Sequence, residues 1–201
     1  MSDNEIKSTL EIVWEKVEKI GKASKEELEI ERLKEEAQKV VGKFLSQESS
    51  DFEKDFINLI TDKPSKHRKV IIKTVVQTFL KNIVLPLTQY QLEDAKKAVQ
   101  GLNIVFKTVP EVSQISRQIE KILEEYYNHK EILFNELKKR FNAGVEGLER
   151  ALSNELGTEV KINVEEQPQF KEEWNKIKEK LDLEYGRQLE YLKNLFEKLI
   201  S

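Results

Sequence analysis

Apolar side chains recur at intervals of three and four residues from about residue 110 to the end of the chain. This spacing keeps side chains on one face of a helix. Two such series, separated by a polar stretch, are typical of two long helices that pair as an antiparallel coiled-coil hairpin. The first series is Val112, Ile115, Ile119, Ile122, Tyr126, Leu133, Leu137, Phe141, Val145, Leu148 and Leu152, and the second is Phe170, Trp174, Ile177, Leu181, Tyr185, Leu192, Leu195 and Leu199.

The two helices of this hairpin differ in length. Helices over residues 111–156 and 169–200 would measure about 69 Å and about 48 Å. If the chain turns directly after Leu156, the second helix ends opposite Tyr127. The apolar stripe of Val112–Leu123 is then left to pack on the preceding part of the chain.

The sequence therefore predicts an all-α protein with an N-terminal helical bundle in residues 1–109. Residues 110–201 form the long helical hairpin, with a turn at about residues 157–168, and the two parts make one integrated unit. Gly144 and Gly147 lie inside the first long helix, where we expect them to allow close packing of the two arms; a hinge is the alternative.

About five helices are expected in the bundle. The first covers residues 5–20, and the most apolar, over residues 65–85, has so wide an apolar arc that we expect it at the centre. Three residues are expected to mark helix ends. Thr88 starts the next helix as an N-cap, Pro110 occupies the first position of the long helix, and Gly157 ends it.

The turn of the hairpin carries a short β-like pattern. Val160, Ile162 and Val164 alternate with Lys161 and Asn163, which is the period of an extended segment. Its apolar face either packs on the hairpin itself or pairs with another copy or a partner protein. Partner binding by Val160, Ile162 and Val164 is the hypothesis carried forward.

Charge is unevenly distributed along the chain. Residues 63–110 carry nine Lys/Arg against two Asp/Glu, whereas residues 1–62 and 111–201 are both acidic. A basic cluster at the start of a helix is suited to an anion. It is also suited to ion pairs with the acidic stretch 26–36, and the lack of interleaved aromatic residues weakens a nucleic-acid role. The anion-binding hypothesis names Lys63, Lys66, His67, Arg68, Lys69 and Lys73.

Most chemistry is disfavoured by the sequence. There is no Cys and there are only two His, so thiol catalysis and thiolate metal sites are excluded. No phosphate-binding, dinucleotide-binding or nucleophile-elbow motif is present. We expect a non-enzymatic protein with no catalytic residues, no cofactor and no metal site.

The composition also indicates where the protein works. The most apolar run, residues 70–85, is too short and too polar to span a bilayer, and no cleavable leader is recognisable. We expect a cytoplasmic protein. The Lys/Glu-rich, Cys-free composition fits a thermophilic source or simply long solvated helices.

Several short runs resemble an uncharacterised bacterial all-helical protein family of unknown function. They are Val160-Lys161-Ile162, Glu166-Gln167-Pro168-Gln169-Phe170, Glu173-Trp174, Leu181-Asp182, Tyr185-Gly186 and, near the start, Lys7-Ser8-Thr9-Leu10-Glu11-Ile12-Val13. The resemblance covers most of the chain in order. It implies a stand-alone helical protein and brings no activity or cofactor.

Two functional hypotheses follow. The first is a structural or protein-interaction role, by self-association or as an adaptor, through the helical hairpin. The second is polyanion or nucleic-acid binding through residues 63–73. A homodimer, an unknown protein partner and a monomer folded back on its own bundle all remain open.

Overall fold

The computed structural model describes residues 25–48 and 51–200, and every secondary-structure element in this part of the chain is helical. The predicted all-α class is therefore confirmed, whereas the helix predicted for residues 5–20 lies outside the described residues. The elements are α2 (Lys25–Leu45), α3 (Phe52–Ile60), α4 (Ser65–Asn82), α5 (Gln89–Val105), α6 (Pro110–Leu156), the 3-10 turn η1 (Val164–Glu166) and α7 (Pro168–Leu199).

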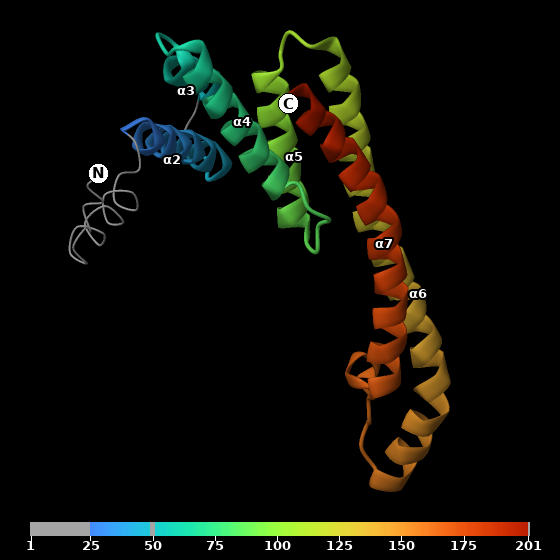
Figure 1. Ribbon diagram of the computed structural model, residues 1–201. Helices are drawn as coiled ribbons and strands as arrows, with labels where there is room; N and C mark the ends of the chain where they lie inside the picture. Colours follow the sequence, from blue (N-terminus) through green and yellow to red (C-terminus); the bar gives the residue numbers. More distant parts are fainter. Residues whose placement is uncertain (1–24, 49–50, 201) are drawn as a thin grey trace, which may run out of the picture.

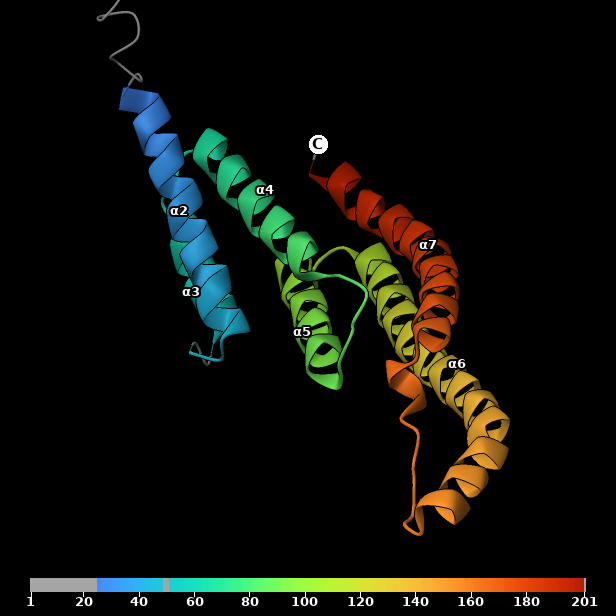
Figure 2. The same ribbon diagram turned by 90° about the horizontal axis from the view of Figure 1, so that it is seen from below.

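The helices are arranged in two groups. α2, α3, α4 and α5 pack on one another, while α6 and α7 lie side by side and project away from them (Figures 1 and 2). We call α2–α5 the bundle, and we call α6 and α7 with their connection the arm. At the base of the arm, α5 contacts α6 and α4 contacts α7.

α4 is the central helix of the bundle, as its wide apolar arc predicts. It contacts α2, α3, α5 and α7. Burial on several sides is possible because apolar residues occupy most of its circumference. The buried apolar side chains of α4 are Ile71, Val75, Val76, Phe79 and Leu80.

One glycine sets the distance between α4 and α5. Gly101 of α5 faces the ring of Phe79, and a Cβ added to Gly101 would overlap that ring. The ring is itself enclosed by edge contacts with Phe44 and Phe52, with centroids 5.9 and 5.2 Å away. The close approach of the two helices therefore depends on the missing side chain.

The helix ends predicted at Thr88, Pro110 and Gly157 are confirmed, whereas α4 ends at Asn82, before the predicted end at residue 85. The Thr88 side chain accepts a hydrogen bond from the Gln91 backbone N–H at 3.2 Å, which satisfies a donor that the helix leaves unpaired. Pro110 is the first residue of α6, and Gly157 ends α6 with φ at +67° in the left-handed region, where glycine meets no steric penalty.

The expected layout of the arm is wrong in its register. The Tyr126 hydroxyl lies 2.6 Å from an Asp182 carboxylate oxygen, and Phe196 contacts Phe106 at the base of the arm, with centroids 5.9 Å apart. α7 therefore reaches the base instead of ending opposite Tyr127. Val112–Leu123 pack on both the bundle and α7.

The reason is that the chain does not turn into α7 at the end of α6. After Gly157 the connection runs back along the last turns of α6, and α7 begins only at Pro168 (Figure 1). The prediction that the two long helices pack closely at Gly144 and Gly147 is wrong for the same reason. A Cβ at either position would meet no neighbouring atom within 4 Å.

The apolar core is divided into two clusters. The larger fills the bundle and the base of the arm, and includes Phe79, Ile119, Leu123 and Phe196. The smaller lies along the arm and consists of Leu137, Val164 and Phe170, with partly buried neighbours from α6 and α7. Because the clusters share no residue, the outer part of the arm depends on its own small core.

Candidate functional site

The outer end of the arm, which we call the tip, comprises residues 142–167. Here the connection, and not α7, lies against the last turns of α6. The Val160 backbone N–H donates to the Ser153 hydroxyl at 2.9 Å, and the Ile162 N–H donates to a Glu149 carboxylate oxygen at 2.7 Å. These two α6 side chains therefore accept hydrogen bonds from backbone N–H groups that, in a β-sheet, would bond to a neighbouring strand. The β-like pattern of the sequence corresponds to an extended segment on α6, not to a strand.

The three residues of the partner-binding hypothesis differ in burial. Val164 is only 2% exposed and packs with Leu137 and Phe170. Val160 and Ile162 are partly buried, while Lys161 between them is exposed. The alternation in sequence thus matches an alternation in burial, and Val164 is the member of this face that is used in the core of the arm.

Exposed apolar surface at the tip comes instead from α6. Leu148 and Leu156 are both more than half exposed, Leu156 at 63%. The tip is also acidic, because residues 142–167 contain six Glu against Arg150 and Lys161, a net charge of −4. Sequence reasoning placed Leu148 on the seam between the helices and therefore missed it as a surface residue.

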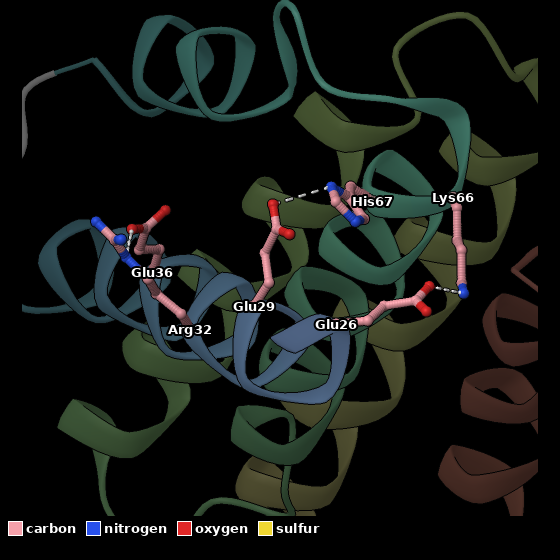
Figure 3. A network of polar contacts seen from close by, with 6 residues as sticks. All are labelled: Glu26, Glu29, Arg32, Glu36, Lys66 and His67. Carbon is pink, nitrogen blue, oxygen red and sulfur yellow. Dashed lines mark hydrogen bonds and ion pairs between the residues drawn. The ribbon is translucent and has the colours of Figure 1, made fainter. Parts of the chain in front are cut away.

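The basic cluster is partly paired with α2. Lys66 forms an ion pair with Glu26, and the Nδ1 of His67 lies 3.6 Å from a Glu29 carboxylate oxygen (Figure 3). The hydrogen bond from Lys66 holds the pKa of Glu26 below its usual value. These contacts bring the acidic stretch 26–36 against the start of α4, which is the internal pairing that the charge pattern allows.

The rest of the basic cluster faces solvent. Arg68, Lys69 and Lys73 are exposed, and none of them has an ion pair with a residue that the structure describes. Lys63 is partly buried just before α4. Over its whole length α4 carries five Lys/Arg and no Asp/Glu, so the charged residues on its exposed face are all basic.

A second apolar surface lies where the arm leaves the bundle. The loop after α4 and the first turn of α5 expose Val84, Leu87 and Tyr90, the last at 74%. We call these three residues the elbow. Beside Val84 and Leu87 a pocket of about 290 Å³ extends to Gly186 and Leu189 of α7. The same pocket is also lined by the charged side chains of Asp182, Glu190 and Lys193.

The elbow loop is held on the arm by a buried lysine. Lys130 of α6 is 6% exposed and donates to the carbonyl oxygens of Leu87 at 2.6 Å and Pro86 at 3.3 Å. Its ammonium also lies 5.2 Å from the ring centre of Tyr127. Burial lowers the pKa of Lys130, and the carbonyls and the ring compensate for part of that cost. No signal in the sequence distinguishes this lysine from an ordinary surface one.

A hydrogen bond in the floor of the elbow pocket joins the two helices of the arm. Tyr126 is almost fully buried and bonds to Asp182 at 2.6 Å. Burial, and secondly this hydrogen bond, raise the pKa of Tyr126 well above its usual value. The phenol is therefore neutral in the folded protein at pH values where an unfolded chain would already ionise.

This difference predicts a pH dependence for the variant Tyr126→Phe. Below about pH 10 the phenol is neutral in both states, and the variant loses only about 1 kcal/mol of stability, the worth of a hydrogen bond. Above about pH 10 the unfolded phenol ionises first, so wild-type stability falls by up to about 1.4 kcal/mol per pH unit. The variant lacks this ionisable phenol, so its stability should fall less steeply as the pH rises. Urea unfolding between about pH 9 and 11 measures both slopes, and parallel slopes would contradict the prediction.

No group of three or more His, Asp or Glu side chains among the described residues is placed to hold a metal ion. A groove of about 520 Å³ between α6 and α7 is lined mainly by apolar surface, with Ile122, Tyr191 and Leu192 among its residues.

None of the helices that the structure describes has the length and apolar character needed to cross a membrane.

Comparison with known proteins gives one match. The model of a group described as "Family of unknown function (DUF6657)" matches residues 57–198, which include α4, α5, the elbow and nearly the whole arm. No curated protein and no solved structure matches the chain.

Proposed function

The chain belongs to DUF6657, a family of unknown function, and we propose that it is a non-enzymatic structural or interaction protein. In this proposal α6 and α7 form an antiparallel coiled coil that presents the tip to a protein partner, and the protein works in the cytoplasm. The bundle serves as the base from which the arm projects.

The exposed leucines of the tip carry this proposal. A helix end that projects into solvent is normally polar, yet Leu148 and Leu156 are each more than half exposed there. The ends of an arm are also where a partner can bind without displacing core packing. Ser153 and Glu149 already hold the backbone of the connection, so the tip keeps one shape for a partner to recognise.

The test is site-specific photo-crosslinking in cells of the source organism. A photo-reactive amino acid at Leu156 should give a protein adduct of discrete mass. The matched control is the same amino acid at Gln38, an exposed position on α2, which should give none. Absence of an adduct from the tip, or equal adducts from both positions, would contradict the proposal.

A second candidate is polyanion binding through the basic cluster, supported by the exposure of Arg68, Lys69 and Lys73 without ion pairs among the described residues. Neutralising these three residues together should abolish retention on a polyphosphate or nucleic-acid column at low salt. Binding that ignores salt, or survives their neutralisation, would rule this candidate out, because phosphate contacts are steeply salt-dependent.

A further inference from the structure

The connection at the tip lies along α6 as a strand lies along its neighbour. The N–H groups of Val160 and Ile162, two residues apart, bond to the side chains of Ser153 and Glu149, which are four residues apart on α6. Two residues of extended chain advance about 6.7 Å, and four residues of helix advance about 6 Å, so the two spacings match. Residues 159–163 therefore run extended and antiparallel to α6.

Only one edge of this extended segment is used within the chain. Backbone groups of alternate residues in a strand bond to opposite sides, and Val160 and Ile162 take the side of α6. Glu159, Lys161 and Asn163 are exposed, and none of their N–H groups has a backbone hydrogen bond with the described residues. Figures 1 and 2 show no other element of the described chain on that side of the connection. We call the outward N–H and C=O groups of residues 159–163 the free edge.

The free edge is held in shape at both ends. Gly157 ends α6 in the left-handed region, and Val164 is buried in the small core of the arm. The Asn163 side chain also accepts a hydrogen bond from the Glu165 N–H at 3.2 Å, which fixes the start of η1. A strand edge that is already ordered binds an extended peptide at low entropic cost, because main-chain hydrogen bonds form without folding of the receptor.

The charges beside the free edge indicate what kind of peptide fits. A pocket of about 410 Å³ borders the segment, and its charged residues are Glu146, Glu149, Arg150, Glu159 and Lys161. Four of these charges form two ion pairs, Glu146 with Arg150, and Glu159 with Lys161 at 3.2 Å. Glu149 has no ion pair with a described residue, and the connection bonds to one of its two carboxylate oxygens. A cation from outside is therefore the group that would balance this pocket.

We propose that the free edge binds an extended peptide of another protein, which adds to it as a strand and places a Lys or Arg side chain in the pocket beside Glu149. This inference deepens the proposed interaction role and rests on it. A second copy of this chain does not supply the cation from the same segment, because its Lys161 is already paired with its own Glu159.

The first experiment selects binders of the full chain from random linear peptides displayed on phage. The selected sequences should share a Lys or Arg flanked by β-branched residues. A synthetic peptide of that sequence should slow hydrogen exchange, read residue by residue by NMR, at least about tenfold at Glu159 and Lys161. Val160 and Ile162 are bonded to α6 beforehand and serve as internal controls. Failure to select any such peptide, or unchanged exchange at Glu159 and Lys161, would overturn the inference.

Two substitutions at one position separate the backbone from the side chain. Lys161→Pro removes an outward N–H and keeps an extended φ, so it should weaken peptide binding at least about tenfold. Lys161→Ala keeps the N–H and should change the affinity by less than about threefold. Protection of the Ile162 N–H checks that the segment still lies on α6 in both variants. If proline displaces the segment, the exchange measurement on the wild type decides alone. Equal losses from the two variants, with Ile162 still protected, would contradict pairing through the edge.

Glu149→Gln tests the choice of a basic peptide. Its amide oxygen can still accept the Ile162 N–H, but the charge is gone, so affinity should fall up to about fivefold at low salt. Replacing the selected Lys or Arg of the peptide with alanine should cause a similar loss and no further loss in the variant. Independent, additive losses would show that this side chain binds elsewhere.

The outcomes separate this inference from the proposed function. A Leu156 adduct with another protein, without protection of the free edge by a peptide, would overturn the inference and leave the interaction role in place. A wild-type dimer that Lys161→Pro dissolves and Lys161→Ala does not would assign the edge to a second copy, and would also overturn it. Absence of both the adduct and the protection would overturn both.

Discussion

Replacing Phe170 with alanine should lower the free energy of unfolding of the outer arm by about 3–5 kcal/mol, the usual cost of removing a buried aromatic ring. Phe170 is almost fully buried, and its ring packs edge-on against Phe134 and Phe141, with centroids 5.6 and 5.3 Å away. The small arm cluster has only two other buried members, Leu137 and Val164. No other part of that cluster can replace the lost ring.

The damage should be local. Because the arm cluster and the bundle core share no residue, residues 134–175 should open while the bundle stays closed. Hydrogen exchange measured by mass spectrometry should show faster exchange in residues 134–175 and unchanged protection in α4 and α5. Phe196→Ala, in the core at the base, is the control and should raise exchange throughout. Identical patterns for the two variants would mean that the two clusters unfold as one unit.

Gly101→Ala should destabilise the bundle by up to about 2 kcal/mol, although alanine is the better helix former. A Cβ at this position would overlap the Phe79 ring, which Phe44 and Phe52 confine on its other sides. Overpacking of a closed core costs more than the roughly 1 kcal/mol that alanine gains in helix propensity. Thermal and urea unfolding measure the net change.

The same substitution at Gly144 should have the opposite sign. That glycine also lies inside a long helix, but no atom lies within 4 Å of the added Cβ. Gly144→Ala should therefore stabilise the protein by up to about 1 kcal/mol. Two changes of the same sign would show that helix propensity, and not the contact with Phe79, decides the effect at Gly101.

The helical class and the helix ends could be predicted from the sequence because local chemistry determines them. Thr88, Pro110 and Gly157 act on their own neighbouring backbone, so their roles do not depend on what packs nearby. The central position of α4 was also predictable, since a helix apolar on most sides can only be buried.

The register of α7 on α6 could not be predicted in the same way. An apolar seam with steps of three and four residues looks alike after a shift by several turns, so Phe170 fits beside Leu137 as well as beside Leu156, about five turns away. The choice is made by long-range contacts such as Tyr126 with Asp182. These contacts pair residues whose partners a single sequence does not identify.

The elbow and the buried position of Lys130 were missed for a related reason. Leu87 and Tyr90 belong to a short loop and a helix start, where exposure depends on the neighbouring helices. Lys130 reads as a surface residue, because a buried lysine is recognisable only by the carbonyls around it. Internal ion pairing, as of Lys66 with Glu26, was one of two interpretations of the basic cluster, the other being an anion site. Only the position of α2 decides between them.

The backward course of the connection makes the reach of the arm independent of its base. α7 starts opposite the middle of the outer arm instead of at the end of α6 (Figure 1). Whole helical turns inserted before Gly157, with matching residues in the connection, would lengthen the tip and leave every contact of α7 with the bundle in place. Insertions or deletions at this one location therefore change the length of the arm without changing how α7 packs on the bundle.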